Sequence, residues 1–266
     1  MIEIFIFLVI LGILAGLISG FFGIGSGIIL VPAYFFLFNY LNFPEEIIPL
    51  LATGTSMTTM ILVIPNAAYT HYLNSNVNME IVKKMLLYTF VFTIFARYIA
   101  LNMESLTLQL IIAFSLIFAA FQVALDIKPK EIKPKINNLE LAFMSCSIGL
   151  ITSLVGIGGG ILMVPYFTFR GLSIREAIGT SSVMGLFIAI SGAIGAFLFA
   201  PMASKNINLM FGSAYIPAVF VVGLSSIYFA KMGANISNNT SSEKLKVAFA
   251  IVVIISAIRI VYDSFI

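Results

Sequence analysis

The chain has 266 residues, of which 61% are hydrophobic and only 9% are charged, and its mean hydropathy is +1.11. Soluble domains are about 45–50% apolar and about 25% charged, so this composition excludes a soluble globular protein. One cysteine, Cys146, and one histidine, His71, exclude a disulfide framework and Cys- or His-rich metal sites. The net charge of +3 is not gathered into a basic patch beside aromatic residues, so nucleic-acid binding is not expected. No cofactor is predicted.

Apolar segments recur along the whole chain, and a helix needs roughly 20 apolar residues to cross a hydrocarbon core of about 30 Å. The first half is predicted to contain segments 3–20, 22–38, 48–70, 82–101 and 106–125. The second half is predicted to contain segments 139–155, 157–169, 177–200, 208–230 and 244–263. We therefore predict an all-α integral membrane protein with eight to ten hydrophobic segments that is in contact with membrane lipid.

The distribution of Lys and Arg predicts the orientation. The loop at 39–49 has no basic residue, whereas the loop at 71–84 and the Lys- and Pro-rich linker at 126–138 are basic. With the N-terminus outside and an odd number of crossings in each half, eleven of the 14 basic residues lie inside; the exceptions are Arg97, Lys205 and Arg259. Cytoplasmic loops of membrane proteins carry such an excess. We expect a protein of the cytoplasmic membrane with both termini outside.

Four sequence elements of the first half return in the same order in the second half. The pairs are Gly16–Pro32 with Gly149–Pro165, Gly54–Ser56 with Gly179–Ser181, Asn76–Met79 with Asn206–Leu209, and Ala113–Phe114 with Ala248–Phe249. This predicts two homologous membrane repeats, residues 1–125 and 139–266, joined by the linker. An odd number of crossings per repeat gives them inverted topology, an architecture of secondary transporters that bind substrate where the halves meet.

Glycine clusters mark the same place in each repeat. Clustered glycines allow the backbone to unwind, and an unwound backbone is tolerated at membrane depth only where it is buried or lines a cavity. A helix that begins after such a break directs free N–H groups and its positive dipole end at an anion. The predicted substrate-binding glycines are Gly23, Gly25, Gly27, Gly156, Gly158, Gly159 and Gly160. The alternative role is close helix packing through small residues.

Each Gly-rich break is compatible with two topologies. The segment at 157–169 is short for a crossing, so the helices are either broken or re-entrant. Eight crossings, or six crossings with two re-entrant pairs, both satisfy the pattern. Either arrangement leaves the two repeats inverted relative to each other.

Hydroxyl side chains accompany the glycines. Ser26, Thr55, Ser56, Thr180 and Ser181 are predicted to donate hydrogen bonds to an oxyanion while leaving the empty site uncharged. The alternative for any one hydroxyl is a bond to a carbonyl one turn earlier in its own helix.

Two ionisable side chains are candidates for coupling or gating. Arg97 lies inside an apolar segment, where an ionisable residue indicates function, although an Arg near a helix end also reaches the headgroups by extending its side chain. His71 closes the third segment and changes charge near neutral pH, so it is a candidate for proton coupling; the alternative is an ordinary solvated histidine.

The paired Gly-x-Gly-x-Gly…Val-Pro elements at 23–32 and 156–165, each followed by Gly-Thr-Ser, resemble those of the TauE/SafE sulfite-exporter family. The resemblance covers essentially the whole chain. It implies a membrane transporter for sulfite, an organosulfonate or a related sulfur-containing anion, moving out of the cytoplasm and driven by an ion gradient, with H⁺ as the candidate ion. Ser26 departs from the commoner Gly-Gly-Gly ending.

Other functions fit the sequence less well. An uptake carrier or a channel for a different small anion uses the same architecture, and saturable flux separates a carrier from a channel. An intramembrane serine protease using Ser26 and His71 is disfavoured, because Gly159 stands at the repeat position of Ser26. No enzyme activity is expected. No feature indicates a particular oligomeric state.

Overall fold

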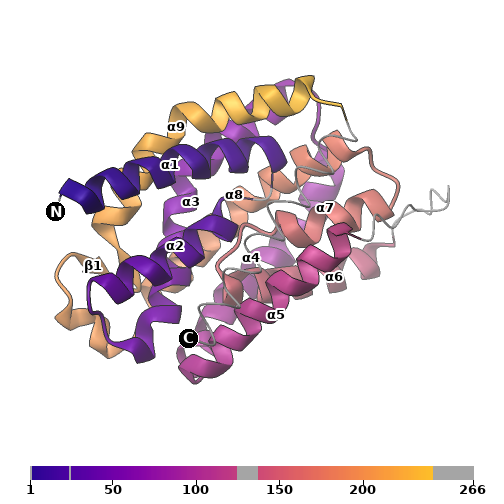
Figure 1. Ribbon diagram of the computed structural model, residues 1–266. Coiled ribbons are helices and arrows are strands. Elements are labelled where there is room, and N and C mark those ends of the chain that lie inside the picture. The colour runs from indigo at the N-terminus through magenta and orange to yellow at the C-terminus, as the bar shows by residue number, and fades with distance from the viewer. Residues whose placement is uncertain (1, 24, 125–136, 242–266) are drawn as a thin grey trace.

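The computed structural model describes residues 2–23, 25–124 and 137–241 (Figure 1). Their helices are α1 (Ile2–Phe22), α2 (Gly27–Tyr40), α3 (Ile48–Leu73), α4 (Met79–Leu101), α5 (Ser105–Ala124), α6 (Asn138–Val155), α7 (Gly160–Phe169), α8 (Ile174–Leu198) and α9 (Ile216–Asn239). Short 3₁₀ turns, Glu45–Ile47 and Met202–Asn206, and the strands β1 (Met210–Phe211) and β2 (Ala214–Tyr215) complete them. The predicted segment 244–263, Arg259 and most of the linker lie outside the described residues.

Six of these helices, α1, α3, α4, α6, α8 and α9, are long and apolar enough to cross a membrane. Large apolar side chains on their outer surfaces are exposed, among them Leu87, Phe143 and Tyr228. Such a surface is stable against lipid and unstable in water, because water solvates apolar side chains poorly. The prediction of an all-α membrane protein is confirmed.

Polar and ring contacts define the two ends of the bundle. At one end, which we call the strand end, Tyr215 of β2 packs its ring against Phe43, and the Ser105 Oγ donates to the carbonyl of Glu45. At the opposite end, the Asn76 amide donates to Asn238, and α8 begins beside the C-terminal end of α9. Figure 1 shows the N-terminus and the strands at the same end.

The short helices α2 and α7 run back beside the helices that precede them. Phe7 of α1 contacts Phe36 of α2, with ring centroids 5.9 Å apart, so α2 returns to the strand end. Tyr166 of α7 donates to Glu140 of α6, so α7 returns to the opposite end. At a rise of 1.5 Å per residue, α2 and α7 are roughly 21 and 15 Å long, too short to cross. Of the two predicted topologies, the geometry of the described residues therefore favours re-entrant pairs at the Gly-rich breaks over full crossings by α2 and α7.

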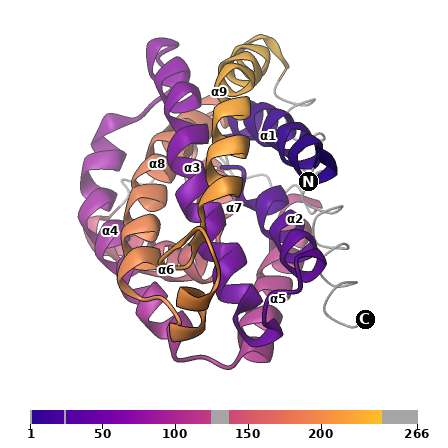
Figure 2. The ribbon, with the colours of Figure 1, turned by 90° about the vertical axis from the view of Figure 1, so that its left-hand side faces the viewer.

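Helices α3 and α8 form the centre of the bundle. They are the most buried of the six long helices, and Figure 2 shows them between α4 on one side and α1 on the other. The outer helices pack through small residues: a Cβ atom at Gly16 of α1 would lie 2.4 Å from the carbonyl oxygen of Ser226 on α9. Close backbone contact through small residues stabilises helix pairs in lipid, where the hydrophobic effect between helices is absent.

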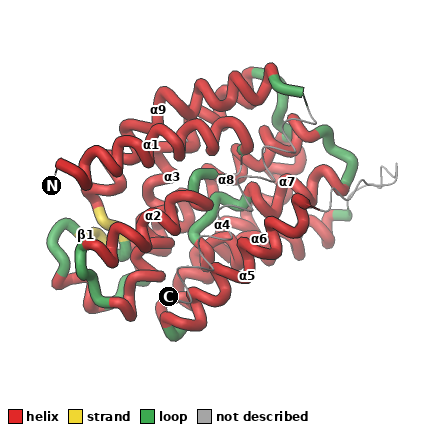
Figure 3. Tube along the Cα trace, viewed as in Figure 1, coloured by secondary structure: helices red, strands yellow, loops and turns green. Residues whose placement is uncertain are grey.

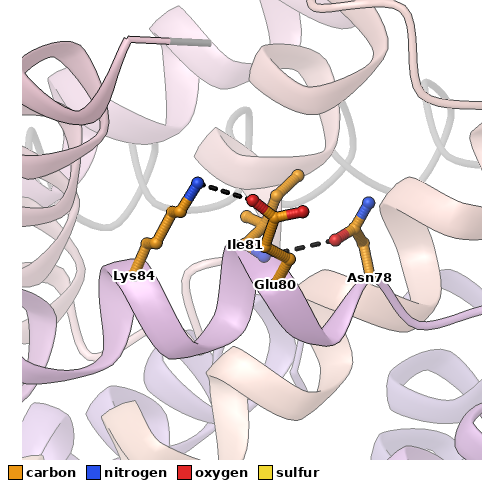
Figure 4. A network of polar contacts seen from close by, with 4 residues as sticks. All are labelled: Asn78, Glu80, Ile81 and Lys84. Carbon is orange, nitrogen blue, oxygen red and sulfur yellow. Dashed lines mark hydrogen bonds and ion pairs between the residues drawn. The ribbon is translucent and has the colours of Figure 1, made fainter. Parts of the chain in front are cut away.

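The start of α4 is capped by a side chain. The Asn78 side chain accepts from the backbone N–H of Ile81 at 3.2 Å, which satisfies one of the free donors of the first turn. Glu80 and Lys84 form an i,i+4 ion pair at 2.6 Å on the exposed face (Figure 4). This ion pair is at the surface and contributes little to stability.

The ninth predicted segment, 208–230, was placed too early. Apolar residues at 209–211 belong to the β1–β2 ribbon, whose turn contains Gly212 with a φ of +62°, and α9 starts only at Ile216. The helix then continues past the polar residues Lys231 and Asn235 to Asn239. The motif at Asn206–Leu209 consequently lies in the connection before the ribbon, whereas its repeat partner Asn76–Met79 leads directly into α4.

Candidate functional site

Two glycine turns interrupt the bundle away from its ends, between α1 and α2 and between α6 and α7. Gly23 and Gly25 have φ values of +62° and +74°, and Gly156 and Gly159 have φ values of +76° and +80°. Residues with a Cβ atom rarely adopt this left-handed conformation, so glycine is needed at these four positions. Figure 3 shows loop segments among the helices at this level as well as at the two ends.

The two turns contact each other directly. A Cβ atom at Gly25 would lie 2.8 Å from the Cα of Gly158, and one at Gly27 would lie 2.2 Å from the carbonyl oxygen of Gly156. These contacts bring the N-terminal ends of α2 and α7 to the same level of the molecule. The structure therefore brings together the glycines that the sequence predicts as one site.

The Gly-Thr-Ser sequence of each half holds the glycine turn of the other half. Ser56 Oγ donates to the carbonyl of Gly156 at 2.7 Å. Ser181 Oγ donates to the carbonyl of Gly23 at 3.0 Å and also lies 2.9 Å from the carbonyl of Ile178 in its own helix. We call these two contacts, together with the threonine contacts described next, the reciprocal clasp.

The threonines of the same sequences bind the beginnings of α9 and α4. Thr55 Oγ1 accepts from the backbone N–H of Tyr215 at 3.0 Å, and Thr180 Oγ1 accepts from the backbone N–H of Asn78 at 2.9 Å. Tyr215 and Asn78 are the residues that directly precede α9 and α4. Each threonine thus fixes where a helix of the other half begins.

The glycine of each Gly-Thr-Ser allows this approach. A Cβ atom at Gly54 would lie 2.6 Å from the carbonyl oxygen of Ser213, and one at Gly179 would lie 2.1 Å from the carbonyl oxygen of Asn76. Ser213 and Asn76 each stand two residues before the residue that the threonine binds. The glycine, the threonine and the serine of each Gly-Thr-Ser sequence therefore have the same role in both halves.

These contacts separate the predicted hydroxyls into two groups. The hydroxyls of Thr55, Ser56, Thr180 and Ser181 bind protein groups across the halves, whereas Ser26 Oγ is fully buried and has no partner. The predicted alternative, a bond within the same helix, applies to Ser181 as a second contact. It also applies to neighbouring residues, since Thr53, Thr58 and Thr59 donate to carbonyls three or four residues earlier.

Arg97 does not extend to the headgroups. Its side chain is fully buried, and it donates to Thr53 Oγ1 at 2.7 Å, to the carbonyl of Leu50 at 3.1 Å and to Ser213 Oγ at 2.9 Å. It thereby joins α4 to the first turns of α3 and to the β1–β2 turn. No carboxylate of the described residues pairs with it. The sequence did not predict Ser213 as a partner, because it lies within a stretch predicted to be helical.

His71 is not an interfacial, solvated side chain. It is 1% exposed, and its Nε2 lies 2.9 Å from the carbonyl of Gly20 in α1, three residues before the glycine turn. Because a carbonyl only accepts, Nε2 carries the proton and Nδ1 presents a lone pair, which has no partner. His71 and Ser26 are not hydrogen-bonded to each other in the described structure, which does not favour the serine-protease alternative.

Charged side chains brace the opposite end. The amide of Asn78 donates to Glu176 at 3.1 Å, which joins the start of α4 to that of α8. Arg170, just after α7, pairs with Glu140 of α6, and this contact raises the pKa of the Arg170 guanidinium. The strand end is thus closed by a buried arginine and the opposite end by partly exposed polar pairs.

Comparisons with known proteins agree with this architecture. The family model described as "Sulfite exporter TauE/SafE" matches residues 8–260. A probable membrane transporter protein of Haemophilus influenzae is 29% identical over 256 residues, which cover 94% of this chain and 95% of the relative. A probable membrane transporter protein of Methanocaldococcus jannaschii is 26% identical over 90% of this chain and 89% of its own length. No solved structure matches the chain significantly.

The reciprocal clasp predicts a stability effect. Ser56→Ala leaves the buried Gly156 carbonyl without its donor, which costs about 1–3 kcal/mol. We expect a lower melting temperature in detergent for Ser56→Ala and a smaller decrease for Ser181→Ala, because Ser181 also bonds its own helix. The matched control is Ser145→Ala, since the buried Ser145 hydroxyl bonds only Leu141 of its own helix. Equal melting temperatures for Ser56→Ala and the control would contradict the importance of the clasp.

Proposed function

Because this chain belongs to the TauE/SafE sulfite exporter family, we propose that it is a secondary transporter that exports a small sulfur-containing anion, sulfite or an organosulfonate. The family and its relatives identify a multi-pass membrane transporter. The observation that carries the finer proposal is the meeting of the two glycine turns, which brings two helix N-termini to one level. Such N-termini favour an anion through their free N–H groups and dipoles.

We propose that the two halves form an inverted repeat that works by alternating access. The equivalent contacts of Gly54–Ser56 and Gly179–Ser181 support the repeat, since each binds the glycine turn of the other half. The helix pairs are also equivalent: α1 packs on α9 as α6 packs on α4. A rotation of one half therefore displaces the turn held by the other, which is how inverted-repeat transporters expose a central site to each side in turn.

The charges of the two ends support an orientation in which the end opposite the strands faces the cytoplasm, so that an exported anion enters there. The strand end carries Glu45, Glu46 and Glu104 and, besides the buried Arg97, only Lys205 among the described basic residues. The opposite end carries the basic residues Lys83, Lys84, Arg170 and Arg175. By the positive-inside rule the opposite end faces the cytoplasm and the N-terminus lies outside, in the cytoplasmic membrane.

Transport assays test the glycine site. Purified protein in liposomes loaded with sodium sulfite should release sulfite with saturable kinetics. Gly25→Val and Gly158→Val should reduce the rate at least tenfold, because a Cβ atom at Gly25 would lie 2.8 Å from the Cα of Gly158 and the two backbones therefore leave no room for a side chain between the turns. The control is Ala193→Val, which adds comparable bulk on α8 at a position away from the two glycine turns. Normal flux in both glycine variants would contradict the site, and a rate that never saturates would indicate a channel.

We propose that Arg97 closes the strand end during transport. Its three partners come from α3 and the β1–β2 turn, so opening this end has to break or rearrange them. Arg97→Lys keeps the charge but loses the planar fork that reaches three acceptors. Hydrogen bonds to charged groups contribute about 1.5–3 kcal/mol each, so losing one shifts the closed state relative to the open state by roughly tenfold or more.

We therefore expect Arg97→Lys to change the maximal sulfite transport rate about tenfold while the protein remains folded and monodisperse. Lys205→Gln, which removes an exposed charge at the same end, should transport like the unchanged protein. An unchanged rate for Arg97→Lys would assign Arg97 to packing alone.

We propose His71 as the residue that couples transport to protons. His71 is bonded through Nε2 to Gly20, which lies three residues before the α1–α2 turn, and its Nδ1 has no partner. Protonation of Nδ1 would therefore place a cation beside that turn. On α9, a Cβ atom at Gly20 would meet the carbonyl oxygen of Ala230, and the charged residue next to it, Lys231, is exposed. Flux of methanesulfonate, an anion that does not itself take up a proton near neutral pH, should depend on pH in that range. In a folded His71→Asn variant this dependence should disappear; if it persists, another group carries the proton.

A further inference from the structure

Unpaired buried polar atoms gather around one of the two glycine turns. In the described residues, seven buried side-chain polar atoms have no hydrogen-bond partner. Four of them flank the α1–α2 turn, namely Ser19 Oγ, Ser26 Oγ, Ser182 Oγ and His71 Nδ1. Buried polar atoms are nearly always hydrogen-bonded, so a group of unpaired ones calls for a specific explanation.

Two of the three hydroxyls belong to residues that border the turn along the chain. The carbonyl of Ser19 accepts from the N–H of Gly23, so Ser19 lies in the turn of α1 just before the break. Ser26 is the last residue before α2. Each of these two serines is at most 1% exposed.

Ser182 reaches the same region from α8. It follows Ser181, which binds the carbonyl of Gly23, and it precedes Gly185, where a Cβ atom would lie 2.8 Å from the carbonyl oxygen of Gly158. Residues three and four apart on a helix share a face, so Ser182 belongs to the α8 surface that covers the turns. It is 2% exposed.

The second glycine turn lacks these free hydroxyls. Thr152, which matches Ser19 in the repeat, donates to the carbonyl of Ile148 at 2.7 Å. The residue that matches Ser26 in the second half is Gly159. The residue that matches Ser182 in the first half is Met57, which follows the first Gly-Thr-Ser. The two turns therefore share a backbone role, while only the α1–α2 turn presents unpaired donors.

We propose that the transported anion binds asymmetrically, at the α1–α2 turn, where the hydroxyls of Ser19, Ser26 and Ser182 donate to its oxygens. This inference rests on the proposed function. Each hydroxyl supplies one donor, and three donors correspond to the three oxygens of sulfite or of a sulfonate group. The N-terminus of α2 adds its positive dipole end, which favours an anion over a cation at the same hydroxyls. The α6–α7 turn packs against this site through Gly158 and holds no ligand oxygen of its own.

Removal of a serine that binds the ligand should affect the melting temperature differently from removal of a serine that only supports the structure. An unpaired buried hydroxyl contributes no hydrogen bond to the empty protein, so its removal does not cost stability. Ser26→Ala and Ser182→Ala should therefore melt at the same temperature as the unchanged protein, or higher, when no ligand is present. The same variants should lose the stabilisation that a bound anion confers, because ligand binding to the folded state raises the apparent stability.

The experiment measures melting temperatures of the purified full-length protein with increasing sodium sulfite and, separately, sodium methanesulfonate. Sodium chloride and sodium acetate at equal ionic strength are the comparison salts. The variants are Ser19→Ala, Ser26→Ala and Ser182→Ala, and the matched control is Ser191→Ala. Ser191 is also a buried serine of α8, but its hydroxyl bonds Phe187 of its own helix.

We expect the unchanged protein and Ser191→Ala to be stabilised by sulfite and methanesulfonate but not by acetate. Each of the three turn variants should need at least a tenfold higher sulfite concentration for the same shift. A full shift in the three variants would overturn the asymmetric site while leaving the proposed function intact. No shift of the unchanged protein with either sulfur anion would contradict the proposed substrate class itself. Equal shifts with sodium chloride and sodium acetate that the serine variants lose would replace the anion with a sodium ion.

Discussion

The reciprocal clasp between the two halves is the contact on which the rest of the structure depends. A glycine turn at membrane depth leaves backbone carbonyls and N–H groups without helical partners, and such groups are costly where no water is present. Ser56 and Ser181 satisfy one carbonyl in each turn, and both donors come from the other half of the chain. Neither turn is therefore complete until the two halves have assembled, so the centre of the molecule is shared between them.

The same constraint explains why glycine is found where it is. Gly25 and Gly158 allow the two turns to touch, and Gly54 and Gly179 allow the central helices to approach the beginnings of α9 and α4. The glycines of α1 serve a different purpose, since Gly16 only brings that helix close to α9. Close helix packing and a broken helix are thus both present, but on different residues. The interruption of α1–α2 and α6–α7 also explains why α2 and α7 turn back before they cross.

Much of the candidate site followed from the repeated motifs. The sequence predicted that the glycine clusters of both halves belong together, and the turns do contact each other. It did not indicate that Thr55, Ser56, Thr180 and Ser181 would bind protein groups of the other half, because a hydroxyl within an apolar segment has the same local pattern whether its partner is a ligand, a carbonyl of its own helix or a distant backbone group. Ser19 was a missed candidate, although its repeat partner Thr152 marked a hydroxyl residue before each turn. The start of α9 was misplaced because a short apolar ribbon and a helix start share the same composition.

Composition and motif order by themselves determined the membrane class, the helical fold, the family and the two glycine-rich breaks, because these depend on local hydropathy and on residues near one another in the chain. Only the tertiary structure decided the environment of Arg97 and His71. The sequence placed both near helix ends, where water or headgroups are within reach, yet α3, the β1–β2 turn and α1 enclose them. Burial and hydrogen-bond partners depend on segments 44 to 116 residues apart for Arg97 and 51 apart for His71, and no local pattern encodes such contacts.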